Sequence, residues 1–65
     1  MKIHVNSEAR EVQGGSLADI VSELGYEGAV IATALNGEFA PVRMRAQLML
    51  KEGDAVEILA PMRGG

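Results

Sequence analysis

The sequence predicts an α+β fold in which one main helix packs on one face of a mixed sheet of about four or five strands. Three features of the 65-residue chain support this fold class. Apolar and polar residues alternate near both ends, at 2–6 and 55–60, with the two-residue period of a strand. Residues 17–24 carry one apolar stripe at helical spacing, and Gly, Asn and Asp gather between these segments as turn signals.

The first segment predicts a β-hairpin. Residues 2–6 place Ile3 and Val5 on one face of a strand. Residues 6–8 favour a tight turn, and residues 9–13 form a short return strand. This hairpin supplies one side of the sheet.

The next segment predicts the helix. Ser16 is a favourable N-cap, and Asp19 lies three residues later, close to a capping box. Gly25 is a natural residue just beyond the C-terminal end. We expect the apolar stripe to face the core, because a domain of this size has little other apolar surface to bury. The stripe consists of Leu17, Ile20, Val21 and Leu24.

The third predicted strand, residues 29–35, is apolar on both faces, which suits a central strand. A single helix covers only one side of a sheet. The other side, with Val30, Ala32 and Ala34, is then either exposed or covered by loops. Exposed apolar patches often mark partner sites, so these residues together with Leu59 form a candidate docking patch.

The second half of the chain completes the sheet. Asn36-Gly37 is a strong hairpin signal, and the edge segment 38–42 that follows is limited by its proline. Residues 43–50 fit a loop, a helical turn or a short strand. Residues 51–54 form a turn, and 55–60 the last strand. This order of elements lets the last strand lie parallel beside the first in the middle of the sheet, which is the β-grasp arrangement.

Composition excludes several functions. The chain has no cysteine and a single histidine, His4, on an outward strand position, so no metal site is expected. The two glycine-rich patterns that bind nucleotides, Gly-x-x-x-x-Gly-Lys-Ser/Thr and Gly-x-Gly-x-x-Gly, do not occur. A net charge of −3 with six scattered basic residues argues against nucleic acid and membrane surfaces as partners. The start of the chain lacks a signal-peptide pattern, and we expect a cytoplasmic protein.

The last five residues, Pro61-Met62-Arg63-Gly64-Gly65, are predicted to form a flexible tail beyond a β-grasp domain of residues 1–60. An extended tail of this length reaches at most about 17 Å. The final glycines have no Cβ atoms, so a narrow channel in another protein would admit them and the terminal carboxylate.

The chain resembles the sulfur carrier proteins of thiamine (thiazole) biosynthesis, a ubiquitin-like family. The resemblance covers nearly the whole chain. Ser7 departs from the family, which often has glycine there; serine is tolerated in a turn. The matching segments are the opening strand with Asn6, the helix at 16–21, the strand end at 35–38, Pro41, 51–58 and 61–65.

The resemblance implies a carrier that is not itself an enzyme and that binds no cofactor. A partner adenylyltransferase uses ATP and Mg to convert the Gly65 carboxylate to an acyl-adenylate. A sulfur donor protein, such as a cysteine desulfurase, then yields a thiocarboxylate, which thiazole synthase consumes. In the tail, Gly64 keeps the tip slim, Met62 fills a partner pocket, and Arg63 pairs with an acid in the channel or keeps the tail soluble.

Three other functions fit parts of this pattern. The small subunit of molybdopterin synthase shares the fold and the thiocarboxylate chemistry, although the segment 58–62 and the length favour the thiazole carrier. A ubiquitin-like protein modifier shares the activation step. An interaction module with an inert tail belongs to a different class.

Overall fold

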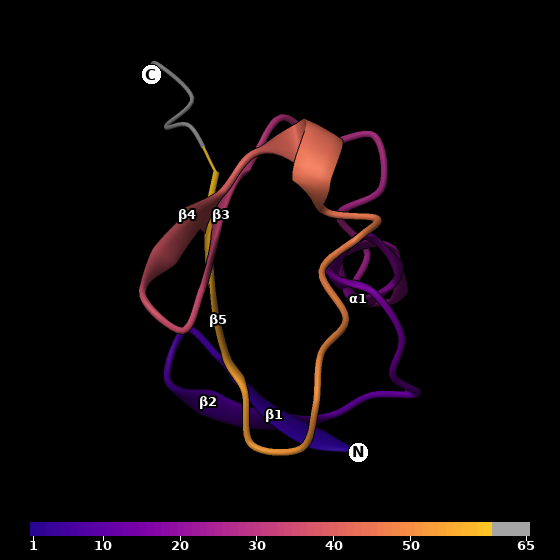
Figure 1. The fold of residues 1–65 in the computed structure, drawn as a ribbon, viewed down its shortest axis with the longest axis vertical. Coiled ribbons are helices and arrows are strands. Elements are labelled where there is room, and N and C mark those ends of the chain that lie inside the picture. Colours follow the sequence, from indigo (N-terminus) through magenta and orange to yellow (C-terminus); the bar gives the residue numbers. More distant parts are fainter. Residues whose placement is uncertain (61–65) are drawn as a thin grey trace.

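The computed structural model describes residues 1–60, and the predicted tail at 61–65 lies outside the described residues. Figure 1 shows the elements along the chain. They are β1 (Lys2–Val5), β2 (Glu8–Glu11), α1 (Leu17–Glu23), β3 (Ala32–Leu35), β4 (Glu38–Ala40), the 3₁₀ turn η1 (Val42–Met44) and β5 (Ala55–Leu59).

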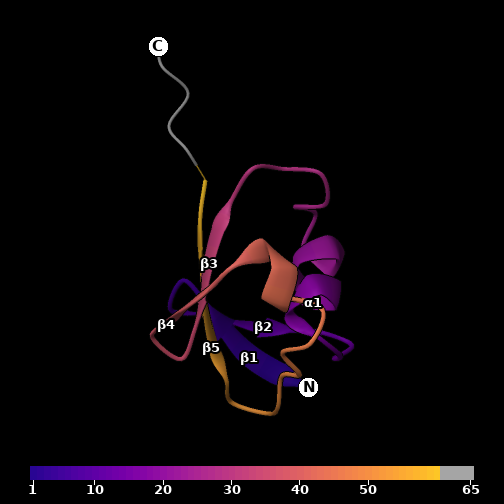
Figure 2. The same cartoon turned by 45° about the horizontal axis from the view of Figure 1, so that its top comes forward.

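The strands form a five-stranded sheet in the order β2-β1-β5-β3-β4. β5 runs parallel to β1, with His4 opposite Ala55, and antiparallel to β3. The two hairpins, β1-β2 and β3-β4, are antiparallel. Figure 2 shows α1 on one side of this sheet. The predicted β-grasp topology is therefore confirmed, with the last strand beside the first at the centre.

The core lies between α1 and the central strands. The helix stripe faces the sheet as predicted, and the inward residues of β1 and β5 meet it. Burying each large aliphatic side chain contributes about 1.5–3 kcal/mol, so these contacts hold the helix on the sheet. The fully buried large side chains are Ile3, Leu17, Ile20 and Val56.

The helix begins with the predicted capping box. The Asp19 N–H donates to Ser16 Oγ, and the Ser16 N–H donates to Asp19 Oδ2, both at 3.1 Å. At the other end Gly25 has a φ of 93°, a left-handed conformation that glycine adopts without strain. The Gly25 N–H donates to the Ser22 carbonyl at 3.0 Å. The helical segment therefore starts and stops where local chemistry favours it.

Both hairpins turn on two residues with positive φ. The first uses Asn6 (51°) and Ser7 (72°), and the second uses Asn36 (51°) and Gly37 (86°). Two consecutive left-handed residues match the right-handed twist of paired strands. The expectation that Glu8 belongs to the turn was wrong, since Glu8 pairs with Val5 as the first residue of β2.

The expected strand at 29–35 is shorter than predicted. Only Ala32–Leu35 forms β3, so Val30 lies outside the sheet. The partner strand β4 ends at Ala40, which pairs with Thr33, because Pro41 has no N–H to continue the ladder. The carbonyl of Ile31 instead accepts a hydrogen bond from Arg45 Nη2 at 2.8 Å.

The ambiguous segment 43–50 begins with the rest of the 3₁₀ turn η1, which confirms a helical turn there, and continues as turn and loop with one isolated β-bridge from Met49 to Ser16. Its backbone carbonyls accept hydrogen bonds from the first turn of α1. The Leu17 N–H donates to the Leu48 carbonyl at 2.7 Å, and the Ala18 N–H donates to the Arg45 carbonyl at 3.1 Å. The first N–H groups of a helix have no partner within it, so this segment satisfies two of them.

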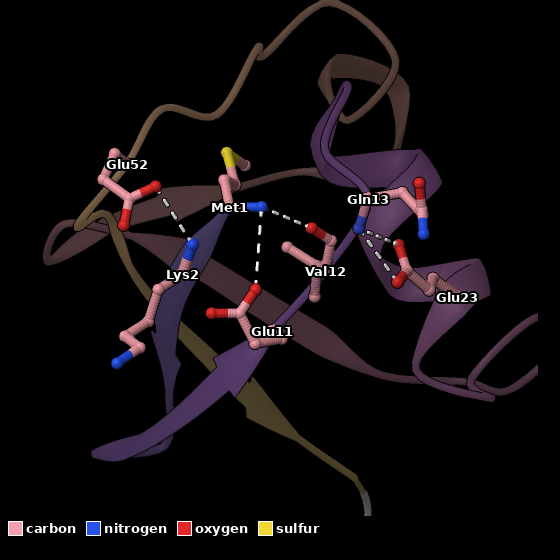
Figure 3. A network of polar contacts seen from close by, with 7 residues as sticks. All are labelled: Met1, Lys2, Glu11, Val12, Gln13, Glu23 and Glu52. Carbon is pink, nitrogen blue, oxygen red and sulfur yellow. Dashed lines mark hydrogen bonds and ion pairs between the residues drawn. The ribbon is translucent and has the colours of Figure 1, made fainter.

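A group of polar contacts surrounds the start of β1 and the chain that follows β2, as Figure 3 shows. The Lys2 N–H donates to Glu52 Oε1 at 3.1 Å, and the Gln13 N–H donates to both carboxylate oxygens of Glu23 at 3.0 Å. The Met1 amino group donates to the Val12 carbonyl at 2.7 Å. The return strand predicted at 9–13 is Glu8–Glu11 in the structure. Beyond Glu11 the Val12 N–H still donates to the Met1 carbonyl at 2.9 Å, and the next N–H, that of Gln13, has a side-chain partner.

Candidate functional site

The outer face of the sheet, on the side away from α1, carries the candidate site. Alternation along β5 buries Val56 and Ile58 and exposes Glu57 and Leu59. Leu59 is 69% exposed, although it is a large apolar residue in a central strand. Because α1 covers only the inner face, no element of the described chain shields these outward residues.

Three of the four predicted patch residues meet on this face through the strand register. Ala32 of β3 lies opposite Leu59, and Ala34 lies opposite Glu57. Val30 is outside the strand but 79% exposed, and it lines one shallow depression together with Ala32 and Leu59. The fold therefore brings the predicted patch residues together around two adjoining depressions, with Val30, Ala32 and Leu59 exposed and Ala34 half-buried.

Phe39 is a patch residue that sequence reasoning missed. It pairs with Ala34 in the β3-β4 hairpin and is 72% exposed. The signal was present in the sequence, because a two-residue turn at Asn36-Gly37 places Leu35 opposite Glu38 and hence Ala34 opposite Phe39. Cross-strand partners share a face, so Phe39 belongs with the alanines.

Two shallow depressions flank Leu59 on this face. One, of about 390 Å³, lies toward Val30 and reaches Ala60, the last described residue. The other has a volume of about 220 Å³. The residues that line the second one on the outer face are Ala32, Ala34, Gly37, Phe39, Glu57 and Leu59. The apolar face thus adjoins the point where the chain continues into the predicted tail.

An asparagine side chain holds the end of β5 in place. The ladder between β1 and β5 stops at Val5, but the Asn6 side chain continues it. Asn6 Oδ1 accepts from the Ile58 N–H at 2.9 Å, and Asn6 Nδ2 donates to the Ile58 carbonyl at 3.1 Å. The primary amide therefore acts as a substitute peptide unit one residue before Leu59.

A second polar cluster holds the start of β5. Asn36 Oδ1 accepts from the Ala55 N–H at 2.9 Å, and Asn36 Nδ2 donates to Asp54 Oδ1 at 3.1 Å. Burial would raise the pKa of the Asp54 carboxyl. Hydrogen bonds from the Lys51 N–H and from Asn36, with the Lys51 ammonium at 3.2 Å, outweigh burial and lower that pKa below its ordinary value. Both ends of β5 are thus fixed.

The remaining predicted site residues lie outside the described residues. These are the attachment residue Gly65 and the tail residues Pro61, Met62, Arg63 and Gly64. Within residues 1–60, no group of three or more His, Cys, Asp or Glu side chains is arranged to hold a metal ion. Within the same part of the chain, no helix has the length and apolar character needed to cross a membrane.

Fold and site together define a small β-grasp protein of the ubiquitin-like class, whose last central strand leads from an apolar outer face into segment 61–65. The family model described as the ThiS family matches residues 3–65. This chain belongs to the ThiS family.

Individual relatives agree with this assignment. The chain is 33% identical over 63 residues to the sulfur carrier protein ThiS of Thermus thermophilus, a match covering 97% of this chain and 98% of the relative. Its structure is similar to the crystal structure of the thiamine biosynthesis protein ThiS from Geobacter metallireducens, with a TM-score of 0.84, 30% identity and coverage of 100% of both chains. An NMR structure of a thiamine biosynthesis protein from the same organism gives a TM-score of 0.83 at 29% identity, covering 100% of this chain and 88% of the other.

Proposed function

We propose that this chain is a sulfur carrier of thiamine biosynthesis and that Gly65 carries the sulfur as a C-terminal thiocarboxylate. The observation that supports this proposal most is the family match over residues 3–65, which includes the final glycines. The relatives named above are a sulfur carrier and thiamine biosynthesis proteins. The molybdopterin synthase alternative is therefore not favoured.

The chemistry requires activation, because a carboxylate is anionic and resonance-stabilised and has no good leaving group. A partner adenylyltransferase would use ATP and Mg to form the acyl-adenylate on Gly65, with release of pyrophosphate. A persulfide from a donor such as a cysteine desulfurase would displace AMP. Thiol cleavage of the resulting acyl disulfide would leave the thiocarboxylate, and thiazole synthase would consume it. The chain is then a co-substrate of cytoplasmic partner enzymes, of which the adenylyltransferase uses ATP.

The outer face supports a docking role in this scheme. Leu59, Val30 and Ala32 form an exposed apolar surface beside Ala60, and the half-buried Ala34 adjoins it. A partner bound there would lie next to the point where the tail begins. We propose that this face docks on the adenylyltransferase while residues 61–65 enter its active site. Glycine suits the tip because it is the least hindered acyl group and has no side chain to obstruct a channel.

Intact mass spectrometry tests the proposal. The protein is incubated with ATP, Mg, the cognate adenylyltransferase and a persulfide source. Replacement of one oxygen by sulfur at Gly65 supports the carrier, whereas an unchanged mass with an active adenylyltransferase contradicts it. Covalent conjugates of the chain on lysines of other proteins in a lysate would instead identify a protein modifier.

A further inference from the structure

The outer face contains one feature that a plain apolar patch does not explain, which is the carboxylate of Glu57. Glu57 is exposed, lies opposite Ala34, and lines the same depression as Phe39 and Leu59. Within residues 1–60 neither ion pair involves Glu57, and no hydrogen bond to its carboxylate occurs. By contrast, the carboxylates of Glu23 and Glu52 accept hydrogen bonds from backbone N–H groups.

The depression beside Glu57 combines an acidic group with apolar walls. Phe39 and Leu59 are large and exposed, and Ala32 and Ala34 present only methyl groups between them. Its volume of about 220 Å³ is several times the ~30 Å³ that one water occupies in the liquid. Lysine and arginine combine an apolar stem with a cationic head, and a guanidinium also stacks on aromatic rings. The depression is complementary to such a side chain.

Other occupants fit this surface less well. An apolar side chain would bury the Glu57 carboxylate without a partner, which costs free energy. A symmetric dimer through this face would bring the same patch, and thus two copies of Glu57, together. Like charges facing each other disfavour such a contact. A phosphate-bearing ligand is repelled for the same reason, and the net charge of the chain is −3.

We propose that the adenylyltransferase inserts one arginine or lysine side chain into this depression, with its cationic head on Glu57 and its stem along Phe39 and Leu59. This inference rests on the proposed function and identifies the chemistry of the partner surface that the outer face selects. Glu57 is then a specificity-determining contact with the partner, and its side chain takes no part in the reaction at the Gly65 carboxylate. Its contribution is to association, so it changes KM and not kcat.

The test measures pyrophosphate release by the adenylyltransferase as a function of carrier concentration. For Glu57→Gln we expect KM to rise about tenfold with kcat unchanged, because the charge acts mainly on association. Added salt should weaken binding of the wild type more than binding of the variant. Glu27→Gln is the control for loss of one negative charge, because Glu27 is exposed in the loop that follows α1, outside the outer face; its carboxylate accepts a hydrogen bond from Ser22 Oγ at 3.1 Å. Glu27→Gln should leave KM and its salt dependence unchanged.

The outcomes separate this inference from the proposed function. Absence of pyrophosphate release with the wild type contradicts the proposed function itself. Normal release with equal KM values for the wild type and Glu57→Gln overturns only the present inference. Phe39→Ala should also raise KM, because the apolar stem of the partner's basic side chain would lose its contact with the aromatic ring. A KM unchanged by Phe39→Ala, or a loss confined to delivery of sulfur to thiazole synthase, also overturns it.

Discussion

The side-chain amide of Asn6 pairs with both backbone polar groups of Ile58, accepting at 2.9 Å and donating at 3.1 Å. This pairing extends β5 past the end of β1 and places Leu59 on the outer face next to the end of the described chain. Sequence reasoning assigned Asn6 to a turn, and the turn is present. The second role of Asn6 depends on a contact with a residue 52 positions away.

Replacing Asn6 by alanine should destabilise the fold by about 1–3 kcal/mol, because two backbone groups of Ile58 lose their partners. Alanine also tolerates the φ of 51° less well than asparagine. Urea unfolding measures the change. Asn6→Gly separates the two effects, since glycine keeps the left-handed backbone but has no amide. If Asn6→Gly is as stable as the wild type, the amide contributes nothing.

Ser7 has a φ of 72°, so Ser7→Gly should stabilise the protein by relieving left-handed backbone strain. We expect a gain of about 0.5–1 kcal/mol, seen as a higher midpoint of thermal unfolding. The control is Ser22→Gly, which places glycine inside α1 and also removes the exposed hydrogen bond from Ser22 Oγ to Glu27; it should cost about 0.5–1 kcal/mol. A loss of stability in Ser7→Gly would show that the serine turn is not strained.

Arg45 is buried and donates to the Ile31 carbonyl at 2.8 Å and to Thr33 Oγ1 at 3.0 Å. Arg45→Ala should destabilise the protein by about 2–3 kcal/mol, because hydrogen bonds to a charged group are lost and the Ile31 carbonyl loses a partner. Arg43→Ala is the control in the same segment. Arg43 is exposed, and its replacement should change stability by less than about 0.5 kcal/mol.

Asp54 makes the stability depend on pH. Its folded-state pKa is lowered from an ordinary value of 3.8, so the folded state binds a proton less readily than the unfolded state. The stabilisation is present above the unfolded-state value and is lost as the pH falls through the folded-state pKa. Chemical denaturation at a series of acidic pH values should show a steeper loss for the wild type than for Asp54→Asn. Parallel curves would mean that other carboxylates dominate.

Local signals in the sequence were sufficient for the helix and the two hairpins. The capping box at Ser16, Gly25 after α1 and the Asn36-Gly37 turn each act through neighbouring residues, so their effects can be foreseen. The length of the third strand could not be foreseen in the same way. It depends on Pro41, which ends the partner strand β4, and on Arg45, which donates a hydrogen bond to the Ile31 carbonyl.

In the candidate site, too, features set by neighbouring residues could be predicted, and features set by contacts between distant strands could not. Period-two alternation placed Val30, Ala32 and Ala34 on one face of the third strand, and the structure confirms this for Ala32 and Ala34, whereas Val30 lies outside β3. The position of Phe39 opposite Ala34 could have been predicted from the two-residue turn that joins β3 and β4. The proximity of Glu57 to Phe39 required the register between β5 and β3, which no single segment specifies, because it follows from how three strands assemble.

The most direct test of the central claim compares the wild type with a variant lacking Gly65, in the presence of the adenylyltransferase, ATP and a persulfide source. We predict that the wild type gains sulfur on its last residue and that the variant gains none. We also expect the thermal unfolding midpoints of the two proteins to coincide, because the proposed role of Gly65 is chemical and the core described above consists of residues within 1–60. Sulfur loading of the truncated chain, or a lowered unfolding midpoint that accounts for its inactivity, would contradict this account.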